Sequence, residues 1–388
     1  AWLALQGIHA TGSVSGSAPS ERFAAADGLF ALHHRLRLGL RERIRALGLA
    51  PRVAALLRAI SIGDKDGIDH SFWRLLQQFG LNHLAVVSGL HIGFMAGVGY
   101  LAGGLLARGG MGGGRLAPLL ALLLAGAYAA LAGFALPTQR ALVMLAVAVL
   151  ARLCGRRAIG PTSLLVAAVL LLLMNPLEVL GSGFWLSFGA VAFLLWLSRC
   201  LNSGGAVRRG LLTHVAMSLA MLVPGALYFG GASQVAAPAN LLMIPLLGFF
   251  VVPIALCAAL VSLLGASWDA WLWHAAAWPL EQLLPPAAHL VEQLRGQLFL
   301  QLDGQMLPLC LALLGVIMLV FPGSFALRIL ALLLCLPLLV PARQPPPGAQ
   351  QALEVTVLDV GQGTAVLLQS GRQVLLYDTG GGDPAGAN

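Results

Sequence analysis

The chain has 388 residues, of which 59% are hydrophobic and only 10% are charged. Soluble domains carry about 25% charged residues, so this composition excludes an ordinary soluble protein and predicts that most of the chain lies in lipid. The formal net charge of +8 comes almost wholly from arginine, since Lys65 is the sole lysine in the sequence. The five cysteines show no CxxC or Cys/His ligand spacing, so we expect buried free thiols.

The first part of the chain contains two different patterns. Residues 1–27 are short β-like runs punctuated by glycine and serine, which predict the end of a small β domain. Residues 28–62 place leucine and isoleucine at helical spacing with arginines between them, which predicts a pair of basic amphipathic helices, broken at Pro51, on a membrane surface. These arginines could contact lipid headgroups or a nucleic-acid backbone. The candidate entry residues are Arg35, Arg41, Arg45 and Arg52.

A polar turn around Asp64 opens the central region, residues 63–341, whose apolar runs are close to the length of a membrane crossing. Segment 268–300 stays ambiguous, because its tryptophans suit a membrane interface while Glu281, Glu292 and Arg295 disfavour a simple crossing. We expect roughly nine spans, near 83–107, 116–135, 138–154, 161–175, 184–199, 211–230, 239–264, 305–322 and 324–341.

The first expected span contains polar residues that an anchor would not need. His83, Ser88 and His91 lie in its first half, and such groups are costly in hydrocarbon unless they are buried in protein or line water. His83, Val87 and His91 are spaced by fours, so we expect them to share one side of a helix. A pore-lining or gating role for His91 and a satisfied interhelical hydrogen bond both remain open.

The same span repeats glycine at every fourth position, at Gly89, Gly93 and Gly97. Small residues with this spacing let a second membrane helix approach closely, so we expect Gly93 and Gly97 to pack against a neighbouring helix.

Two later spans also contain polar residues or helix breakers. Arg140 follows Pro-Thr-Gln at the start of one span, where it could extend to the interface or face a water-filled path. Asn240 and Pro245 put an amide and a helix breaker inside another span, and broken helices are typical of translocation routes. Together these features favour a conduit over a simple anchor.

After a proline-rich linker, residues 342–388 alternate in a way that predicts strands. Acidic residues follow two of these strands beside glycine turns, an arrangement common to metal-dependent hydrolases and to plain turns. We expect the sequence to be a piece of a longer protein and predict no metal site within it, because no His-x-His-x-Asp-His run occurs before its last residue. The turn residues are Asp359, Gly361, Gln362, Gly363, Asp378 and Gly380.

Residues 59–64 (Ala-Ile-Ser-Ile-Gly-Asp) and 82–93 (Asn-His-Leu-Ala-Val-Val-Ser-Gly-Leu-His-Ile-Gly) resemble the competence-domain signature of ComEC-type DNA-internalisation proteins. Further landmarks of that family follow in order, at 133–141, 175–188 and 240–245. Residues 1–27 look like the end of the family's OB-like domain. The tail motifs are similar to the opening of its metallo-β-lactamase-like domain, although Thr364 stands where the family usually has an acidic residue.

The resemblance implies a mainly α fold, a polytopic transmembrane helical bundle with a truncated β-rich domain at each end, in the bacterial inner membrane. It implies a channel that moves single-stranded DNA into the cytoplasm during natural transformation. Expected partners are single-stranded DNA, the lipid bilayer, a periplasmic DNA receptor, and a cytoplasmic motor or single-strand-binding proteins. The implied path or gating residues are Asp64, His83, Ser88, Gly89, His91, Arg140, Asn240 and Pro245.

Two alternatives remain open. The membrane core could merely tether a metal-dependent nuclease, for which the resemblance implies bound Zn or Mn in a domain that this sequence only begins. It could also be a small-solute transporter, whose mark would be inverted repeats between its halves, and the sequence shows no clear internal repeat.

Overall fold

The structure is a computed structural model that describes residues 28–109, 113–155, 160–201, 205–266, 268–294, 298–301, 310–312, 314–315, 318, 324–336, 354–358, 365–370 and 373–378. The chain divides into two compact units, Ala1–Leu339 and Val340–Asn388. The residues of the expected amino-terminal β domain, 1–27, lie outside the described part, so that domain stays a prediction.

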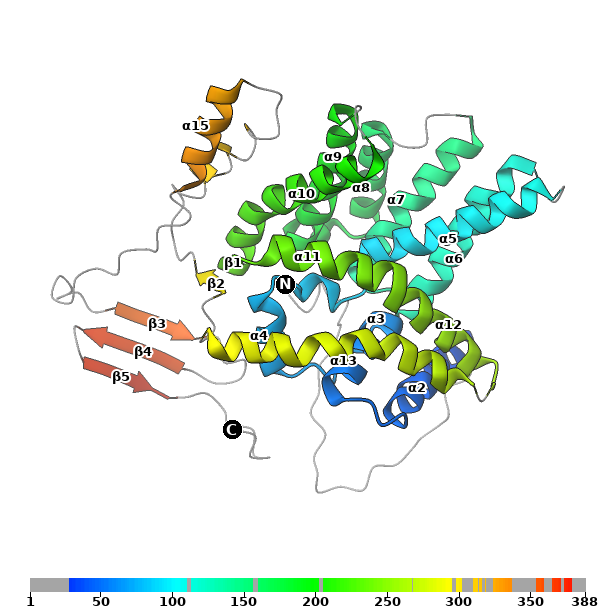
Figure 1. The fold of residues 1–388 in the computed structure, drawn as a ribbon, viewed down its shortest axis with the longest axis horizontal. Coiled ribbons are helices and arrows are strands. Elements are labelled where there is room, and N and C mark those ends of the chain that lie inside the picture. The colour runs from blue at the N-terminus through cyan, green and yellow to red at the C-terminus, as the bar shows by residue number, and fades with distance from the viewer. Residues whose placement is uncertain are drawn as a thin grey trace. The chain divides into compact units, whose positions relative to one another are not determined.

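The first unit is helical (Figure 1). Short 3₁₀ turns, η1 (Asn82–Leu84), η2 (Gly113–Arg115) and η3 (Pro176–Leu180), and one π turn, η4 (Leu246–Val251), join some of its helices. Two short strands, β1 (Gly231–Ser233) and β2 (Phe299–Gln301), pair antiparallel. The helices are α2 (Leu29–Arg45), α3 (Pro51–Ile62), α4 (His70–Gln78), α5 (Gly89–Arg108), α6 (Leu116–Leu131), α7 (Leu136–Leu153), α8 (Pro161–Met174), α9 (Ser182–Cys200), α10 (Ala206–Phe229), α11 (Ala236–Pro245), α12 (Val252–Leu263), α13 (Asp269–Gln293) and α15 (Phe325–Cys335).

Five helical segments in the described residues are long and apolar enough to cross a membrane, as expected of a multi-pass membrane protein. Three shorter apolar helices, α6, α8 and most of α15, account for further predicted spans, while much of 305–322 lies outside the described residues. The ambiguous segment forms α13, a single helix of 25 residues that is not among the five. The five segments are α5, α7, α9, Ala206–Tyr228 and Ala236–Leu263.

The last of these segments corrects the expectation of a broken helix at Pro245. Residues 236–263 run without interruption from α11 into α12 (Figure 1). Proline removes a backbone donor and its ring crowds the preceding turn. The wider π turn η4 accommodates this disruption immediately after Pro245. The proline therefore reshapes this span without ending it.

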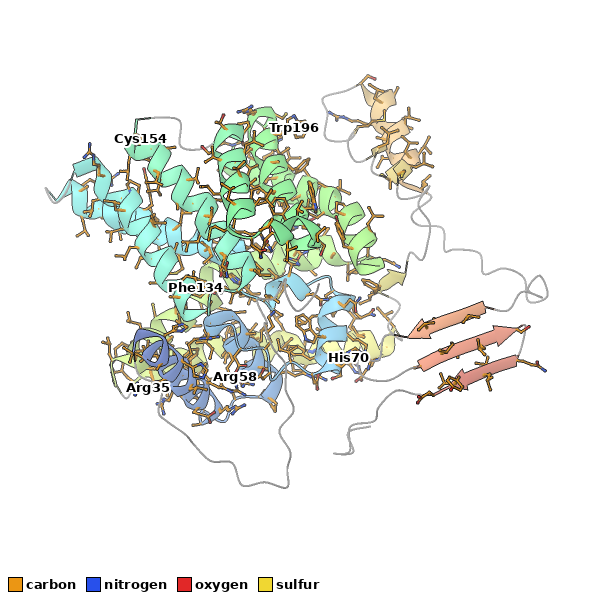
Figure 2. The ribbon with its side chains drawn as sticks, turned by 180° about the vertical axis from the view of Figure 1, so that it is seen from behind. Arg35, Arg58, His70, Phe134, Cys154 and Trp196 are labelled. Carbon is orange, nitrogen blue, oxygen red and sulfur yellow. The ribbon has the colours of Figure 1, made fainter. Side chains whose placement is uncertain are left out.

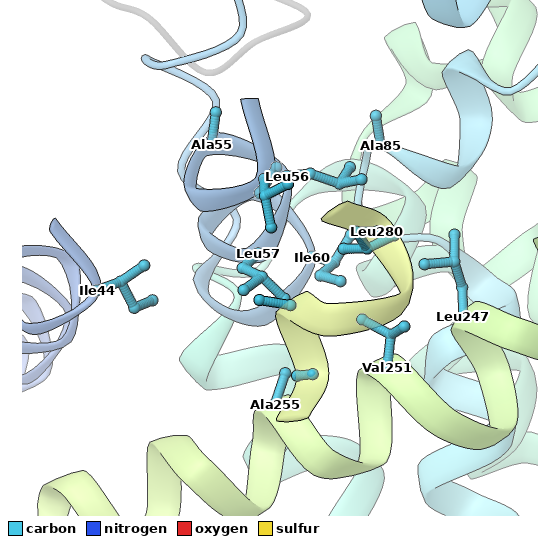
Figure 3. Packing of buried hydrophobic residues seen from close by; sticks show 14 of the residues in the cluster. Ile44, Ala55, Leu56, Leu57, Ile60, Ala85, Leu247, Val251, Ala255 and Leu280 are labelled. Atoms are coloured by element: carbon cyan, nitrogen blue, oxygen red, sulfur yellow. The ribbon is translucent and has the colours of Figure 1, made fainter. Parts of the chain in front are cut away.

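The largest apolar core forms around α3, which differs from the expected surface helix. Leu57 and Ile60 have no exposed area, and they pack against Leu280 of α13 and Val251 of η4 (Figure 3). Most residues of α3 from Val53 to Ile62 are buried in this core, so the helix packs against other helices along most of its length. Its position at a membrane surface stays a prediction. The preceding helix α2 keeps an exposed face, with Leu32, Leu36 and Leu38 on it.

The second unit contains three described strands, β3 (Glu354–Leu358), β4 (Ala365–Ser370) and β5 (Gln373–Tyr377). They form an antiparallel meander in the order β3–β4–β5, with Val357 opposite Val366 and Leu367 opposite Leu376. The alternating tail sequence thus does form strands. Whether they open a larger β-rich domain stays a prediction.

Candidate functional site

The loop before α5 separates the two histidines that the sequence placed on one helix. His83 lies in the 3₁₀ turn η1 and is exposed, whereas His91 lies in the first turn of α5 and has no exposed area. Helix α5 starts only at Gly89, because Ser88 is extended and its backbone N–H donates to His91 Nδ1 at 3.3 Å. The expectation of a shared helical face for His83, Val87 and His91 is therefore corrected.

Several buried polar atoms near this loop lack a hydrogen-bond partner among the described residues. They include His91 Nε2, Ser88 Oγ, Asn82 Oδ1 and Asn240 Oδ1. Since His91 Nδ1 accepts a hydrogen bond, the neutral ring carries its proton on Nε2, which makes that atom a donor without an acceptor. A buried polar group without a hydrogen-bond partner destabilises the fold. The presence of several such atoms here suggests that these residues serve a purpose other than packing.

Contacts at two glycines hold this loop and α5 against the long Ala236–Leu263 segment, which carries Asn240. A Cβ at Gly80 would lie 2.7 Å from the Cβ of Ala236, and a Cβ at Gly248 would collide with the ring of Phe94. The structure therefore places Asn240 on the segment that packs beside the loop. Pro245, on the same segment, is exposed.

The close approach between α5 and a neighbour uses other glycines than those predicted. Gly93 and Gly97 have no described atom within 4 Å of a built Cβ. A Cβ at Gly103 would lie 2.6 Å from the Cα of Ala117, and one at Gly99 would collide with the backbone of Leu120. Both glycine pairs repeat every four residues, so the sequence reveals the spacing but cannot tell which face meets α6. A Cβ at Gly89 would lie 3.3 Å from the Cβ of Ala141.

Arg140 neither extends to an interface nor faces a described cavity. It follows Pro137, which occupies the first turn of α7, and it is only 6% exposed. Its Nη1 donates to Glu178 Oε2 at 3.0 Å, and both side chains are buried. Sequence reasoning missed Glu178, although a charge inside an apolar bundle usually pairs with another, and Glu178 is one of few acidic residues in this region.

The candidate entry arginines are mostly engaged within the protein. Arg41 pairs with Asp64 at 3.3 Å and with Asp66 at 2.9 Å, and Asp64 also accepts from Arg58 at 3.1 Å. The predicted gating residue Asp64 is therefore part of an ion-pair network at the end of α3.

The other three entry candidates lie on exposed parts of α2 and α3. Arg45 pairs with Glu42 at 2.8 Å. Arg52 donates to Ser71 at 3.1 Å and lies 5.8 Å from the centre of the Phe72 ring. Arg35 is exposed on α2 (Figure 2).

Backbone-directed bonds tie α2 and α3 to the end of α6. Tyr128 of α6 donates its hydroxyl to the carbonyl of Ile60 at 2.5 Å, and Arg37 Nη2 donates to the carbonyl of Ile62 at 2.7 Å. Gly63 adopts φ +71° directly against the carbonyl of Ala132, where a Cβ could not fit. Burial lowers the pKa of the Arg37 guanidinium below its usual value.

A second tie joins α2 to α13. Arg43 donates two hydrogen bonds to the buried carboxylate of Asp269, at 2.8 Å and 2.6 Å. Ser262 also donates to this carboxylate, at 2.5 Å. The bond from Arg43 is the main cause that lowers the pKa of Asp269 to about 2. No sequence signal indicates this pair, because the two residues are 226 positions apart.

The two best-defined pockets in the described residues do not contain the predicted path. One is lined by Leu119, Leu122, Leu123, Gly126 and Ala127, and the other by Gly114, Arg115, Pro118, Arg152, Leu153 and Gly155. Neither includes His91, Arg140 or Asn240. His91 and Arg140 are buried, whereas Asn240 is half-buried.

The acidic turn residues that the sequence suggested as part of a metal-dependent hydrolase belong to the second unit. Within the described ranges, no three His, Cys, Asp or Glu side chains gather in a way that could hold a metal ion. Asp378 ends β5 with φ 55°. The other turn residues singled out from the sequence lie outside the described residues, so their role is untested: Asp359, Gly361, Gln362, Gly363 and Gly380.

Comparison with known proteins places the chain in a family. A family model described as "Competence protein" matches residues 60–326. The chain is 31% identical to "Competence protein ComA" of Neisseria gonorrhoeae, over 98% of this chain and 54% of that protein. It is 33% identical to "ComE operon protein 3" of Bacillus subtilis (strain 168), over 56% and 28% respectively. It is 30% identical to "Recombination protein 2" of Haemophilus influenzae, over 55% and 29%.

The chain thus spans about half the length of these relatives or less. No solved structure matches it. The family model covers well over half of the chain, including the loop before α5, Arg140, Glu178 and Asn240. The match confirms the resemblance seen in the sequence, and the chain belongs to the ComEC-type family of competence proteins.

Proposed function

We propose that this chain is the membrane core of a DNA-uptake protein, and that it conducts single-stranded DNA across the bacterial inner membrane during transformation. The names of two relatives, a competence protein and a recombination protein, support a role with DNA. The expected partners on either side, a periplasmic DNA receptor and a cytoplasmic motor or single-strand-binding protein, belong to the same proposal.

The observation that carries the proposal is the presence of buried polar and charged groups inside an apolar bundle. Arg140 and Glu178 form an ion pair, and His91 keeps an unmatched donor, within helices apolar enough to cross a membrane. A simple anchor gains nothing from such groups, whereas intramembrane ionisable residues typically mark a path for ions or polar substrates.

The described arrangement represents the closed state in this proposal. Arg140 is held by Glu178, and His91 is enclosed by packed helices. Passage of a strand then requires α7 to separate from η3 and α9, which would expose Arg140 to a backbone phosphate. Arg35 and Arg52, on exposed parts of α2 and α3, could attract the strand before it enters.

The test is DNA uptake in a competent host that carries the full-length protein. His91→Ala and Arg140→Ala are expected to reduce transformation strongly at normal protein level, which an immunoblot of membranes would establish. Arg152→Ala is the matched control, because Arg152 lies near the other end of the same helix as Arg140 and lines a pocket without predicted path residues. Uptake at the wild-type rate in both His91→Ala and Arg140→Ala cells would refute a path through these residues.

A further inference from the structure

We infer that the unoccupied edge of the Arg140 guanidinium is a binding site for a phosphodiester phosphate, and that Glu178 holds this arginine closed until the phosphate replaces its carboxylate. The inference rests on the proposed function for the source of the phosphate. It adds to the proposed function the edge of the guanidinium that binds the phosphate and the direct competition between phosphate and the Glu178 carboxylate.

The guanidinium is only partly used in the closed state. Nη1 donates to a single oxygen of Glu178 at 3.0 Å. Nε is buried without a partner, and Nη2 makes no hydrogen bond with any described residue. The arginine is 6% exposed, and its Nε is buried away from solvent as well as lacking a partner.

The unused donors form the edge that suits a phosphate. Nε–H and Nη2–H point the same way in the plane of the guanidinium, and two parallel N–H groups bind two oxygens of a phosphate or carboxylate at once. Glu178 does not use this geometry, because it contacts the arginine through one oxygen on another nitrogen. A buried ion pair offsets its desolvation only with good geometry and additional hydrogen bonds, so the pair is open to a better ligand.

Gly183 lets α9 approach this edge closely. A Cβ at position 183 would lie 2.8 Å from Arg140 Nη2, closer than a side-chain carbon normally approaches. Gly183 lies in the first turn of α9, where its backbone needs no glycine, since its φ is not positive. Glycine weakens a helix relative to alanine. Its benefit here is that α9 approaches Nη2 closely without a side chain that would cover this nitrogen.

The carboxylate lies on a short segment that is hydrogen-bonded to α9. Glu178 belongs to the 3₁₀ turn η3, where Asn175 Oδ1 accepts from the N–H of Leu177 at 3.2 Å. Trp185 of α9 donates its Nε1–H to the carbonyl of Val179 at 2.8 Å. Exchange of Glu178 for a phosphate would therefore release Arg140 from this tied segment, while Val147 of α7 stays in one apolar cluster with Phe184 and Phe188 of α9.

The neighbouring aromatic residue favours a nucleic-acid strand over a free phosphate. Trp185 is 55% exposed, although its indole N–H is fixed to the turn that carries Glu178. An exposed ring beside a phosphate site can stack a base, which is how single strands are commonly bound without sequence preference. Inorganic phosphate shares the anion chemistry but lacks a base, so the two ligands can be separated by experiment.

The test uses the purified full-length protein in detergent, with melting temperature as the readout. Each variant is measured in potassium chloride, in potassium phosphate of equal ionic strength, and with a single-stranded oligothymidylate. Glu178→Gln removes the competing charge and keeps an oxygen that can accept from Nη1. Phosphate is expected to raise the melting temperature of Glu178→Gln more than that of the wild type.

Two further variants separate the site from general electrostatics. The added phosphate effect should vanish in Arg140→Lys/Glu178→Gln, because lysine keeps the charge but has no paired donors. Glu281→Gln, on the distant helix α13, should respond to phosphate as the wild type does. Absence of the gain in Glu178→Gln, or an equal gain in the double variant or in Glu281→Gln, overturns the inference.

Gly183→Ala keeps the proposal testable if Glu178→Gln does not fold. The added methyl group meets only the flexible end of Arg140, so we expect normal folding with a reduced response to both phosphate and oligothymidylate. An unchanged response in Gly183→Ala overturns the inference. A response to phosphate but not to oligothymidylate supports the anion site while it counts against the proposed function. If oligothymidylate raises the melting temperature equally in the wild type and in the variants at Glu178, Arg140 and Gly183, the result supports the proposed function but counts against this anion site.

Discussion

The contact between α5 and α6 and the contact between α7 and the η3–α9 segment hold the bundle together by different means. The first is backbone against backbone, with Gly99 and Gly103 set against Leu120 and Ala117. The second combines one ion pair, Arg140 with Glu178, with an apolar cluster that includes Val147 of α7 and Phe184 and Phe188 of α9. Small residues in close contact give a rigid, uncharged joint, whereas a single-oxygen ion pair can exchange partners. The comparison predicts that α5 and α6 move together and that the bundle opens at α7.

The largest expected effect comes from breaking the charged contact. Arg140→Ala leaves the Glu178 carboxylate buried without its partner, and loss of one member of a buried pair costs about 3–5 kcal/mol. We expect a large fall in the melting temperature of the purified protein. The double variant Arg140→Ala/Glu178→Ala should recover much of that loss. If the single variant melts as the wild type does, the pair does not hold this contact.

The glycine contact offers a matched pair on a single helix. Gly99→Ala places a methyl group into the backbone of Leu120, and overpacking of this kind costs about 1–3 kcal/mol. Gly97→Ala adds the same methyl group where no described atom lies within 4 Å, and should be neutral or slightly stabilising. Thermal melting of the two variants measures the difference. Equal melting temperatures would show that α5 and α6 do not pack as described.

The smallest effect is expected at the tie between α2 and α13, which lies outside the membrane spans. The pKa of Asp269, about 2, is below the usual 3.8, so its carboxylate stabilises the fold above pH 4 and this contribution is lost as the pH falls toward 2. We expect a loss on the order of 1 kcal/mol, since Arg43 is partly exposed to solvent. Melting temperatures followed over this pH range should fall less in Asp269→Asn, which has no carboxylate to titrate. Parallel curves for the two proteins would contradict this assignment.

The ion-pair network at the end of α3 neutralises part of the charge on the candidate entry arginines. Arg41 shares its charge with Asp64 and Asp66, while Arg58 also pairs with Asp64. A row of arginines in the sequence suggests a basic surface, but the acids that neutralise part of it come from the turn after the next helix. Arg35 and Arg52 lie on exposed parts of α2 and α3, outside this network.

The sequence by itself determined the membrane helices and the family. Apolar runs near 83–107, 138–154 and 184–199 became α5, α7 and α9, because in lipid each backbone group must find its hydrogen bond within its own helix. The polar run at 82–93 also indicated the family before any fold was known. These features are local, so a pattern of residues along the chain is enough to specify them.

Only the tertiary structure decided which faces and which charges meet. Gly99 and Gly103, and not Gly93 and Gly97, touch α6, although the two pairs have the same spacing. Arg140 pairs with Glu178, which is 38 positions away in the sequence, and Arg43 pairs with Asp269, which is 226 positions away. The physical reason is that helix formation depends on neighbours in sequence, while the choice of packing face and ion-pair partner depends on groups brought together only after the helices assemble.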